Sequence, residues 1–99
     1  MEAVIEHLSA RKIIPIAIFD DPNKAVPLAH ALLAGGCDVV EISFRSPTAA
    51  ASIAEIVADV PEMFVGAGSL LSVDDVSEAI SAGATFGNGS AYRKGRREE

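Results

Sequence analysis

A strand-and-helix unit recurs along this chain at nearly constant spacing, and the recurrence limits the possible folds to a few. Apolar segments rich in β-branched residues begin at Ile13, Val39, Phe64 and Ala84, which are 26, 25 and 20 residues apart. A segment with helical apolar spacing follows each of the first three. Consecutive strands joined by single helices must be parallel, with right-handed crossovers. The spacing therefore predicts an α/β fold with about four parallel strands.

The helices of these units carry start and stop signals in the sequence. Residue types that favour a helix start stand before each one, and they are Asp20–Asn23, Ser46–Thr48, and Ser72 with Asp75 three residues later. Pro27 is expected in or just after the first turn of its helix, because proline breaks a helix interior. Gly83 is expected to end the last of the three helices. A short leading helix is also expected within residues 1–11, before the first strand.

Two architectures join parallel strands in this way, an open doubly wound sheet and a (β/α)8 TIM barrel. The short, even rhythm and the lack of a glycine-rich first turn favour the barrel. A closed barrel takes roughly 200 to 250 residues, so the 99 residues of this sequence correspond to its N-terminal half. A half-barrel has two unpaired sheet edges, through which it is expected to dimerise or aggregate.

Composition separates the domain from its C-terminal end. The chain has a net charge of −6, but four of its eight basic residues lie in the last seven, so that residues 1–92 alone carry −8. We therefore expect a partial-barrel domain over 1–86 and a disordered basic tail over 87–99, which has no apolar periodicity. The acidic domain is not expected to bind nucleic acid.

The same composition indicates the cellular setting. No apolar run approaches the roughly 20 residues of a membrane span, and the first twelve residues do not resemble a signal peptide. The single cysteine, Cys37, can form neither an internal disulfide nor a metal cluster. We expect a cytoplasmic protein that binds no membrane and no metal.

Glu41 is the first candidate for chemistry, because it interrupts an apolar strand in which a charge is costly. Arg45 lies four residues further along, and an even separation puts both residues on the same face if the strand continues. If that face is the barrel interior, both point towards the C-terminal mouth, where barrel enzymes have their active sites. The alternative is an exposed polar pair at a sheet edge.

The segment Val65–Leu70 contains Gly66 and Gly68 but lacks the third glycine of a dinucleotide-binding turn, and it follows the third strand rather than the first. Glycines at the end of a strand are expected instead to let a ligand or the backbone approach closely. Ser69 would then present its hydroxyl at the same mouth as Glu41.

The segment Gly36–Arg45 closely resembles the active-site signature of the 2-keto-3-deoxy-6-phosphogluconate aldolase / 4-hydroxy-2-oxoglutarate aldolase family, with Ser43 where threonine is usual. The resemblance extends over about residues 7 to 86. Further matches lie in four short segments, Ile14–Ile16, Ala25–Ala29, Ala34–Gly36 and Val65–Ser69.

This resemblance implies a class I aldolase of carbohydrate metabolism, of the Entner–Doudoroff type, that is usually a homotrimer and uses neither metal nor cofactor. Such a lyase cleaves a 2-keto-4-hydroxy acid to pyruvate and an aldehyde through a Schiff base. By the same likeness Glu41 is the general acid and base, Arg45 binds the substrate carboxylate, and Ser69 adds a hydrogen bond there.

The lysine that forms the Schiff base lies on a later strand in the family. The lysines of this chain are Lys12, Lys24 and Lys94, and none is expected at the mouth. The family's Ser-Pro-Gly after the fourth strand is replaced by Gly89–Ala91. We therefore expect a truncated or frameshifted member that is inactive alone. The alternatives are a non-catalytic half-barrel that acts by self-assembly or with a complementing chain, and a different phosphate-handling barrel enzyme.

Overall fold

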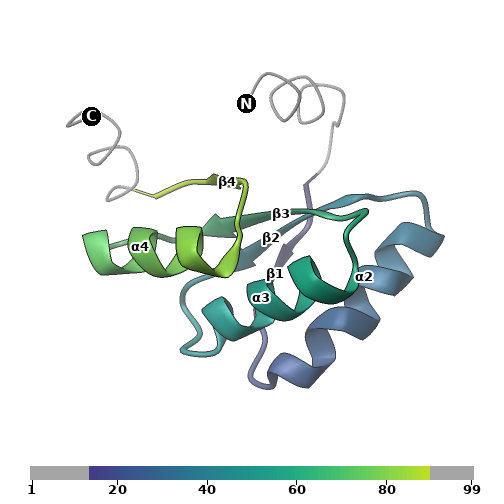
Figure 1. The fold of residues 1–99 in the computed structure, drawn as a ribbon, viewed down its shortest axis with the longest axis horizontal. Helices are drawn as coiled ribbons and strands as arrows, with labels where there is room; N and C mark the ends of the chain where they lie inside the picture. The colour runs from purple at the N-terminus through teal and green to yellow at the C-terminus, as the bar shows by residue number, and fades with distance from the viewer. Residues whose placement is uncertain (1–13, 90–99) are drawn as a thin grey trace.

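The computed structural model of the protein describes residues 14–89 (Figure 1). The leading helix expected within 1–11 and residues 90–99 of the expected tail lie outside this range. The elements in chain order are β1 (Ile16–Ala17), the 3₁₀ helix η1 (Pro22–Lys24), α2 (Ala25–Ala34), β2 (Val39–Ser43), α3 (Ala49–Asp59), β3 (Phe64–Gly68), α4 (Val73–Ala82) and β4 (Phe86–Gly87).

The four strands form one parallel sheet in the order β1-β2-β3-β4. Each strand therefore pairs with its neighbour in the sequence, and no crossover skips a strand. The register places Ile16, Glu41, Gly66 and Phe86 in one row across the sheet. The predicted number of strands and their parallel direction are confirmed.

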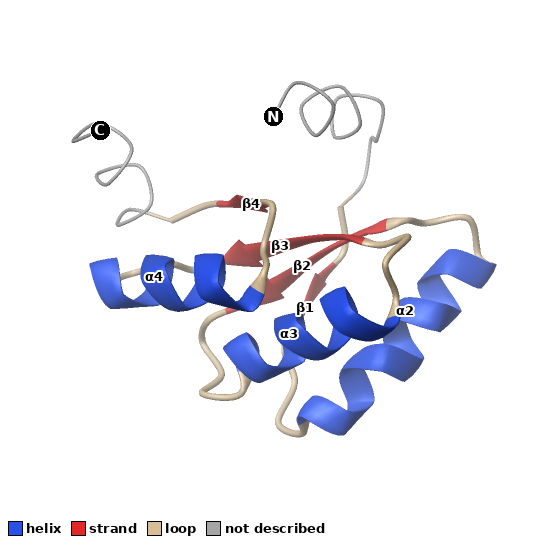
Figure 2. Cartoon of the chain, viewed as in Figure 1, coloured by secondary structure: helices blue, strands red, loops and turns tan. Residues whose placement is uncertain are grey.

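All three α-helices cover the same face of this sheet (Figure 2). An open doubly wound sheet has helices on both faces and a strand order that reverses, whereas a barrel keeps sequential strands inside a ring of helices. The structure therefore has the architecture of half a (β/α)8 barrel, as the even spacing predicts. We call the face turned away from the helices the inner face.

The core lies between the sheet and the helices. Strand alternation sends Val40 and Ile42 of β2 towards the helices, where they join a buried apolar cluster with Ile53 and Ile56 of α3. The other residues of β2 must then face the inner side, and they are Val39, Glu41 and Ser43. All five residues of β2 are buried. Glu41 is consequently a carboxylate inside the fold, on the side opposite the apolar core.

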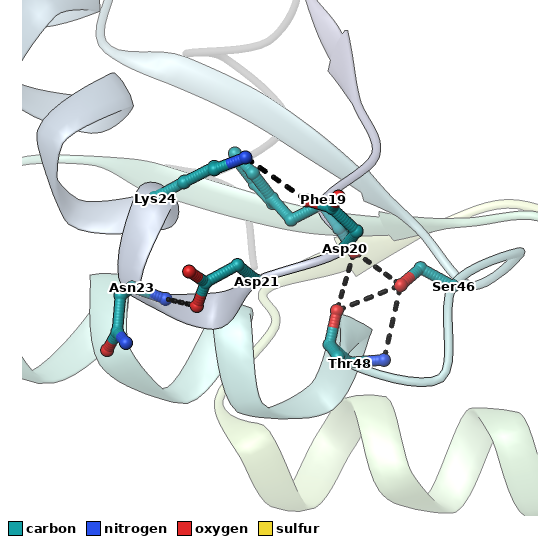
Figure 3. Close-up of polar contacts among 7 residues, drawn as sticks. All are labelled: Phe19, Asp20, Asp21, Asn23, Lys24, Ser46 and Thr48. Carbon is teal, nitrogen blue, oxygen red and sulfur yellow. Dashed lines mark hydrogen bonds and ion pairs between the residues drawn. The ribbon is translucent and has the colours of Figure 1, made fainter.

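Two elements differ from their predicted bounds. The apolar segment that begins at Ile13 and predicts the first strand continues to Phe19, but β1 ends at Ala17. The carbonyl of Phe19 instead accepts hydrogen bonds from the Ser46 and Thr48 hydroxyls, the latter at 2.6 Å (Figure 3). Because these two side chains bind the loop after β1, α3 begins only at Ala49. Ser46 and Pro47 are residue types typical of an N-cap and a first helical turn, but both precede the helix.

The other predicted helix signals are confirmed. Pro27 is the third residue of α2, so it lies in the first turn, where its missing N–H costs nothing. The Ser72 hydroxyl caps α4 by accepting from the Asp75 backbone N–H at 3.1 Å. The Asp75 carboxylate accepts from the N–H of Leu71, one residue before the cap. Gly83 ends α4 with φ of +106°, which favours glycine.

Candidate active site

The buried carboxyl group of Glu41 is the centre of the candidate site. Glu41 lies in the middle of β2 on the inner face, and only 7% of its surface is exposed. Burial raises the pKa of this carboxyl from its ordinary value of 4.5, because the charged form loses its hydration. A carboxyl whose pKa is raised in this way is a characteristic feature of acid–base sites, although buried structural groups share it.

The Asn88 side chain holds this carboxyl. Its amide nitrogen Nδ2 donates a hydrogen bond to Glu41 Oε1 at 2.6 Å. The bond favours the charged carboxylate and so partly opposes the effect of burial on the Glu41 pKa. Asn88 was not among the predicted site residues, because it lies in the segment assigned to the tail. The sequence carries no signal for it, because β4 has only two residues and shows no alternation that could be extended to Asn88.

Gly66 and Gly68 of β3 make room for two side chains of this same chain. A Cβ built on Gly68 would lie 2.5 Å from Glu41 Oε2, and one on Gly66 would lie 2.2 Å from the Phe86 ring. The predicted close approach at these glycines therefore occurs. Its partners are the Glu41 carboxyl and the Phe86 ring, whereas the prediction was a ligand or the backbone.

Ser69 lies beside Ser43 at the C-terminal ends of β3 and β2. The Ser43 hydroxyl donates to Ser69 Oγ at 3.3 Å and accepts from the Arg45 backbone N–H, also at 3.3 Å. Ser69 has φ of +58°, a left-handed conformation that non-glycine residues seldom adopt. Ser69 thus directly follows β3, at the strand ends that form the mouth of a barrel.

Arg45 lies two residues beyond the end of β2, the strand that contains Glu41. β2 stops at Ser43, so the strand alternation used to put Arg45 on the inner face does not extend to it. Arg45 is exposed, and within residues 14–89 its guanidinium has no hydrogen bond or ion pair. The alternative of two exposed polar residues is wrong for Glu41, which is buried.

Lys24 is the lysine of the described segment. Its Nζ lies 3.3 Å from Asp20 Oδ1, and both side chains are largely exposed. Lys24 is the last residue of the 3₁₀ helix η1 (Figure 3). Residues 14–89 contain no group of three His, Cys, Asp or Glu side chains that could hold a metal ion. They also contain no helix long and apolar enough to cross a membrane.

Comparison with known proteins gives one consistent result. The family model for KDPG and KHG aldolase matches residues 4–89. The 2-dehydro-3-deoxy-phosphogluconate aldolase of Treponema pallidum is 37% identical over 86 residues, which are 87% of this chain and 41% of that protein. The KHG/KDPG aldolase of Escherichia coli K12 is 38% identical over 79 residues, 80% of this chain and 37% of the relative.

Solved structures agree with the sequence matches. KDPG aldolase of Legionella pneumophila, solved with pyruvate captured as a covalent carbinolamine intermediate, has a TM-score of 0.73 at 32% identity, over 77% of this chain and 37% of that one. The Zymomonas mobilis ZM4 enzyme, solved with 3-phosphoglycerate, has a TM-score of 0.70 at 37% identity, over 77% and 36%. The chain thus spans about two fifths of the length of the relatives it matches.

Proposed function

The chain belongs to the family of KDPG and KHG aldolases, and from this membership we propose that it supplies the acid–base half of an aldolase active site. The reaction is cleavage of a 2-keto-4-hydroxy acid, such as 2-keto-3-deoxy-6-phosphogluconate or 4-hydroxy-2-oxoglutarate, to pyruvate and an aldehyde. The observation that carries the proposal is the buried Glu41 carboxyl on the inner face of the half-barrel.

Glu41 is proposed as the group that moves protons. Cleavage requires a base that accepts the proton of the C4 hydroxyl as the C3–C4 bond breaks, and an acid that later returns a proton to C3. A carboxyl works in both roles best when its pKa lies near the working pH. Burial moves the pKa of Glu41 upward, in that direction.

Arg45 and Ser69 are proposed to bind the carboxylate of the keto acid. A guanidinium binds a planar carboxylate with two parallel hydrogen bonds, and that of Arg45 is exposed and has no partner within residues 14–89. The Ser69 hydroxyl lies next to Ser43 at the end of β3. Both groups follow the strands at the C-terminal edge of the sheet, which supports a shared substrate site at the mouth.

The amine that completes the reaction is proposed to come from outside these 99 residues. The Schiff base forms when a neutral lysine attacks the C2 ketone to give a carbinolamine, which then loses water. Of the three lysines in the sequence, Lys24 is paired with Asp20 in an exposed turn. We propose that the 99-residue polypeptide alone does not form the Schiff base with pyruvate.

Reductive trapping tests this part of the proposal. The polypeptide is incubated with pyruvate and borohydride and then weighed by mass spectrometry, with the E. coli relative as a positive control. We expect an adduct on the relative and none on this chain. A stable adduct on Lys12, Lys24 or Lys94 would show that the chain contains its own nucleophile.

A chimeric protein, joined from this chain and the E. coli relative, tests the role of Glu41. Residues 1–89 replace the matching part of the E. coli enzyme, and pyruvate release from 2-keto-3-deoxy-6-phosphogluconate is measured. Glu41→Gln is expected to lower kcat by about 10²- to 10⁴-fold, the usual range for a general acid or base. The control Glu78→Gln removes the same charge from an exposed position of α4. Equal activity of the two variants would refute the assignment of Glu41.

Self-assembly is a second candidate function, favoured by a separate observation. Ile16 and Ile18 lie at the β1 edge and are 68% and 57% exposed. Large apolar side chains at an open sheet edge are expected to associate with a second copy or with a complementing chain. This candidate requires no catalysis by the chain itself.

A further inference from the structure

We infer that Asn88 is a positioning residue for the Glu41 carboxyl, and that its amide can hydrogen-bond this group in both of its protonation states. The inference rests on the proposed function and deepens it, because an acid–base group changes its protonation state in every cycle and must be held in both states. It is carried by the geometry around β3 and β4.

The backbone of Asn88 is fixed on both sides. Its N–H donates to the Ala67 carbonyl at 3.0 Å, and its own carbonyl accepts from the Leu70 N–H at 3.2 Å. The two partners lie one residue before and two residues after Gly68, over which the Glu41 carboxyl lies. These two backbone hydrogen bonds fix the Asn88 side chain next to the carboxyl, and its Nδ2 donates to Glu41 Oε1 at 2.6 Å.

The absence of a side chain at Gly68 makes this contact possible. A Cβ there would lie 2.5 Å from Glu41 Oε2 and 2.8 Å from its carboxyl carbon. Oε1 is occupied by Asn88, whereas Oε2 has no hydrogen bond within the described residues. The arrangement thus holds the carboxyl through one oxygen and leaves the other for a reacting group.

The chemistry of an amide suits this position. Its NH₂ donates to an ionised carboxylate, and after a half-turn of the amide its oxygen accepts from a protonated carboxyl. Aspartate at this position would repel the carboxylate, and leucine would offer no hydrogen bond to either form. Asparagine therefore lets Glu41 gain and lose a proton without leaving a buried polar group unpaired.

Carbon-detected NMR titration of the 99-residue chain tests the inference without requiring catalysis. The Glu41 carboxyl signal is followed with pH in the wild type, in Asn88→Leu and in Asn88→Asp. Both variants are expected to raise the midpoint. The first removes the bonds to both forms, of which the bond to the charged carboxylate is the stronger, and the second adds a like charge. Asn23→Leu, at the other asparagine of the chain, is the matched control and is expected to leave the midpoint unchanged.

A second measurement needs no substitution of Asn88 and so is not lost if those variants misfold. The side-chain NH₂ signals of Asn88 should shift with the same midpoint as the Glu41 carboxyl, and this shift should vanish in Glu41→Gln. Signals of Asn88 that do not follow Glu41, or a folded Asn88→Leu with an unchanged midpoint, would overturn the inference. Either result can occur whether or not the chimeric protein is active, so the two proposals fail separately.

Discussion

Glu41 is a residue whose burial as a charged carboxylate lowers the stability of the folded chain. Its pKa is raised by burial in the folded state, so the folded chain binds a proton more tightly than the unfolded chain does. The contribution of Glu41 to stability is then greatest below the ordinary value of 4.5 and is lost as the pH rises through the raised folded value. Glu41→Gln removes the titration, and we expect it to be more stable than the wild type at pH 8, with the difference shrinking towards pH 4.

Urea unfolding at several pH values measures this difference. Glu78→Gln serves as the control, because it changes the same charge at an exposed site on α4. A stability difference between wild type and Glu41→Gln that stays constant from pH 4 to pH 8 would mean that the carboxyl is not destabilised by burial.

Gly68 offers a second residue-scale prediction. In Gly68→Ala the new Cβ would lie 2.5 Å from Glu41 Oε2, which is the end of a flexible side chain and can move aside. We expect the free energy of unfolding to change by no more than about 1 kcal/mol, because the lower backbone entropy of alanine offsets the crowding. The bond between Glu41 and Asn88 should nevertheless be lost, which the Asn88 NH₂ signals would report. Retention of those signals at their wild-type positions would contradict the prediction.

Strand β4 depends on a different glycine, two residues earlier. A Cβ on Gly66 would lie 2.2 Å from the Phe86 ring, and an aromatic ring in register with β3 cannot swing away as a carboxyl can. We expect Gly66→Ala to destabilise the chain by about 1 to 3 kcal/mol, as overpacking does. If hydrogen exchange, measured relative to the wild type, increases more in β4 than in β2, the damage lies at β4. Equal stability of Gly66→Ala and Gly68→Ala would argue against overpacking at Gly66.

The elements could be predicted where a signal is local. Ser72 caps a backbone N–H only three residues away, and Pro27 and Gly83 act through their own backbone, so their roles could be read from the sequence. The start of α3 could not, because it depends on hydroxyl groups bonding Phe19, which is 27 residues before Ser46. A contact between loops that far apart leaves no periodic signal in either segment.

For the whole molecule, spacing predicted the half-barrel, whereas alternation left open whether Glu41 faces the barrel interior or the solvent at a sheet edge. Ser69 could be predicted because it directly follows a strand. Arg45 was placed by extending that alternation two residues beyond the last strand residue, Ser43, where backbone direction is no longer periodic. Asn88 was missed because the fourth strand, Phe86–Gly87, is too short to show alternation. The contacts between β3 and β4 place it beside Glu41.

The open edge of the half-barrel gives the last prediction, which concerns association. Ile16 lies in the same row as Glu41, and it and Ile18 are largely exposed, so removing their side chains from water would favour pairing of two copies. The double variant Ile16→Thr and Ile18→Thr keeps β-branched side chains suited to a strand but weakens that drive. We expect light scattering after size exclusion to show concentration-dependent association of the wild type that the variant loses in large part.

Ile80→Thr is the control for this experiment, because Ile80 is 65% exposed but belongs to α4 on the helix-covered face. If the β1 edge drives association, this variant should associate like the wild type. If Ile80→Thr reduces association equally, the association is non-specific and hydrophobic. A wild type that is monomeric at every concentration would remove the basis for self-assembly. A defined dimer sensitive only to the β1 substitutions would mean that the inner faces or edges of two copies meet, and Glu41 would then lie near a boundary that a complementing chain could also occupy.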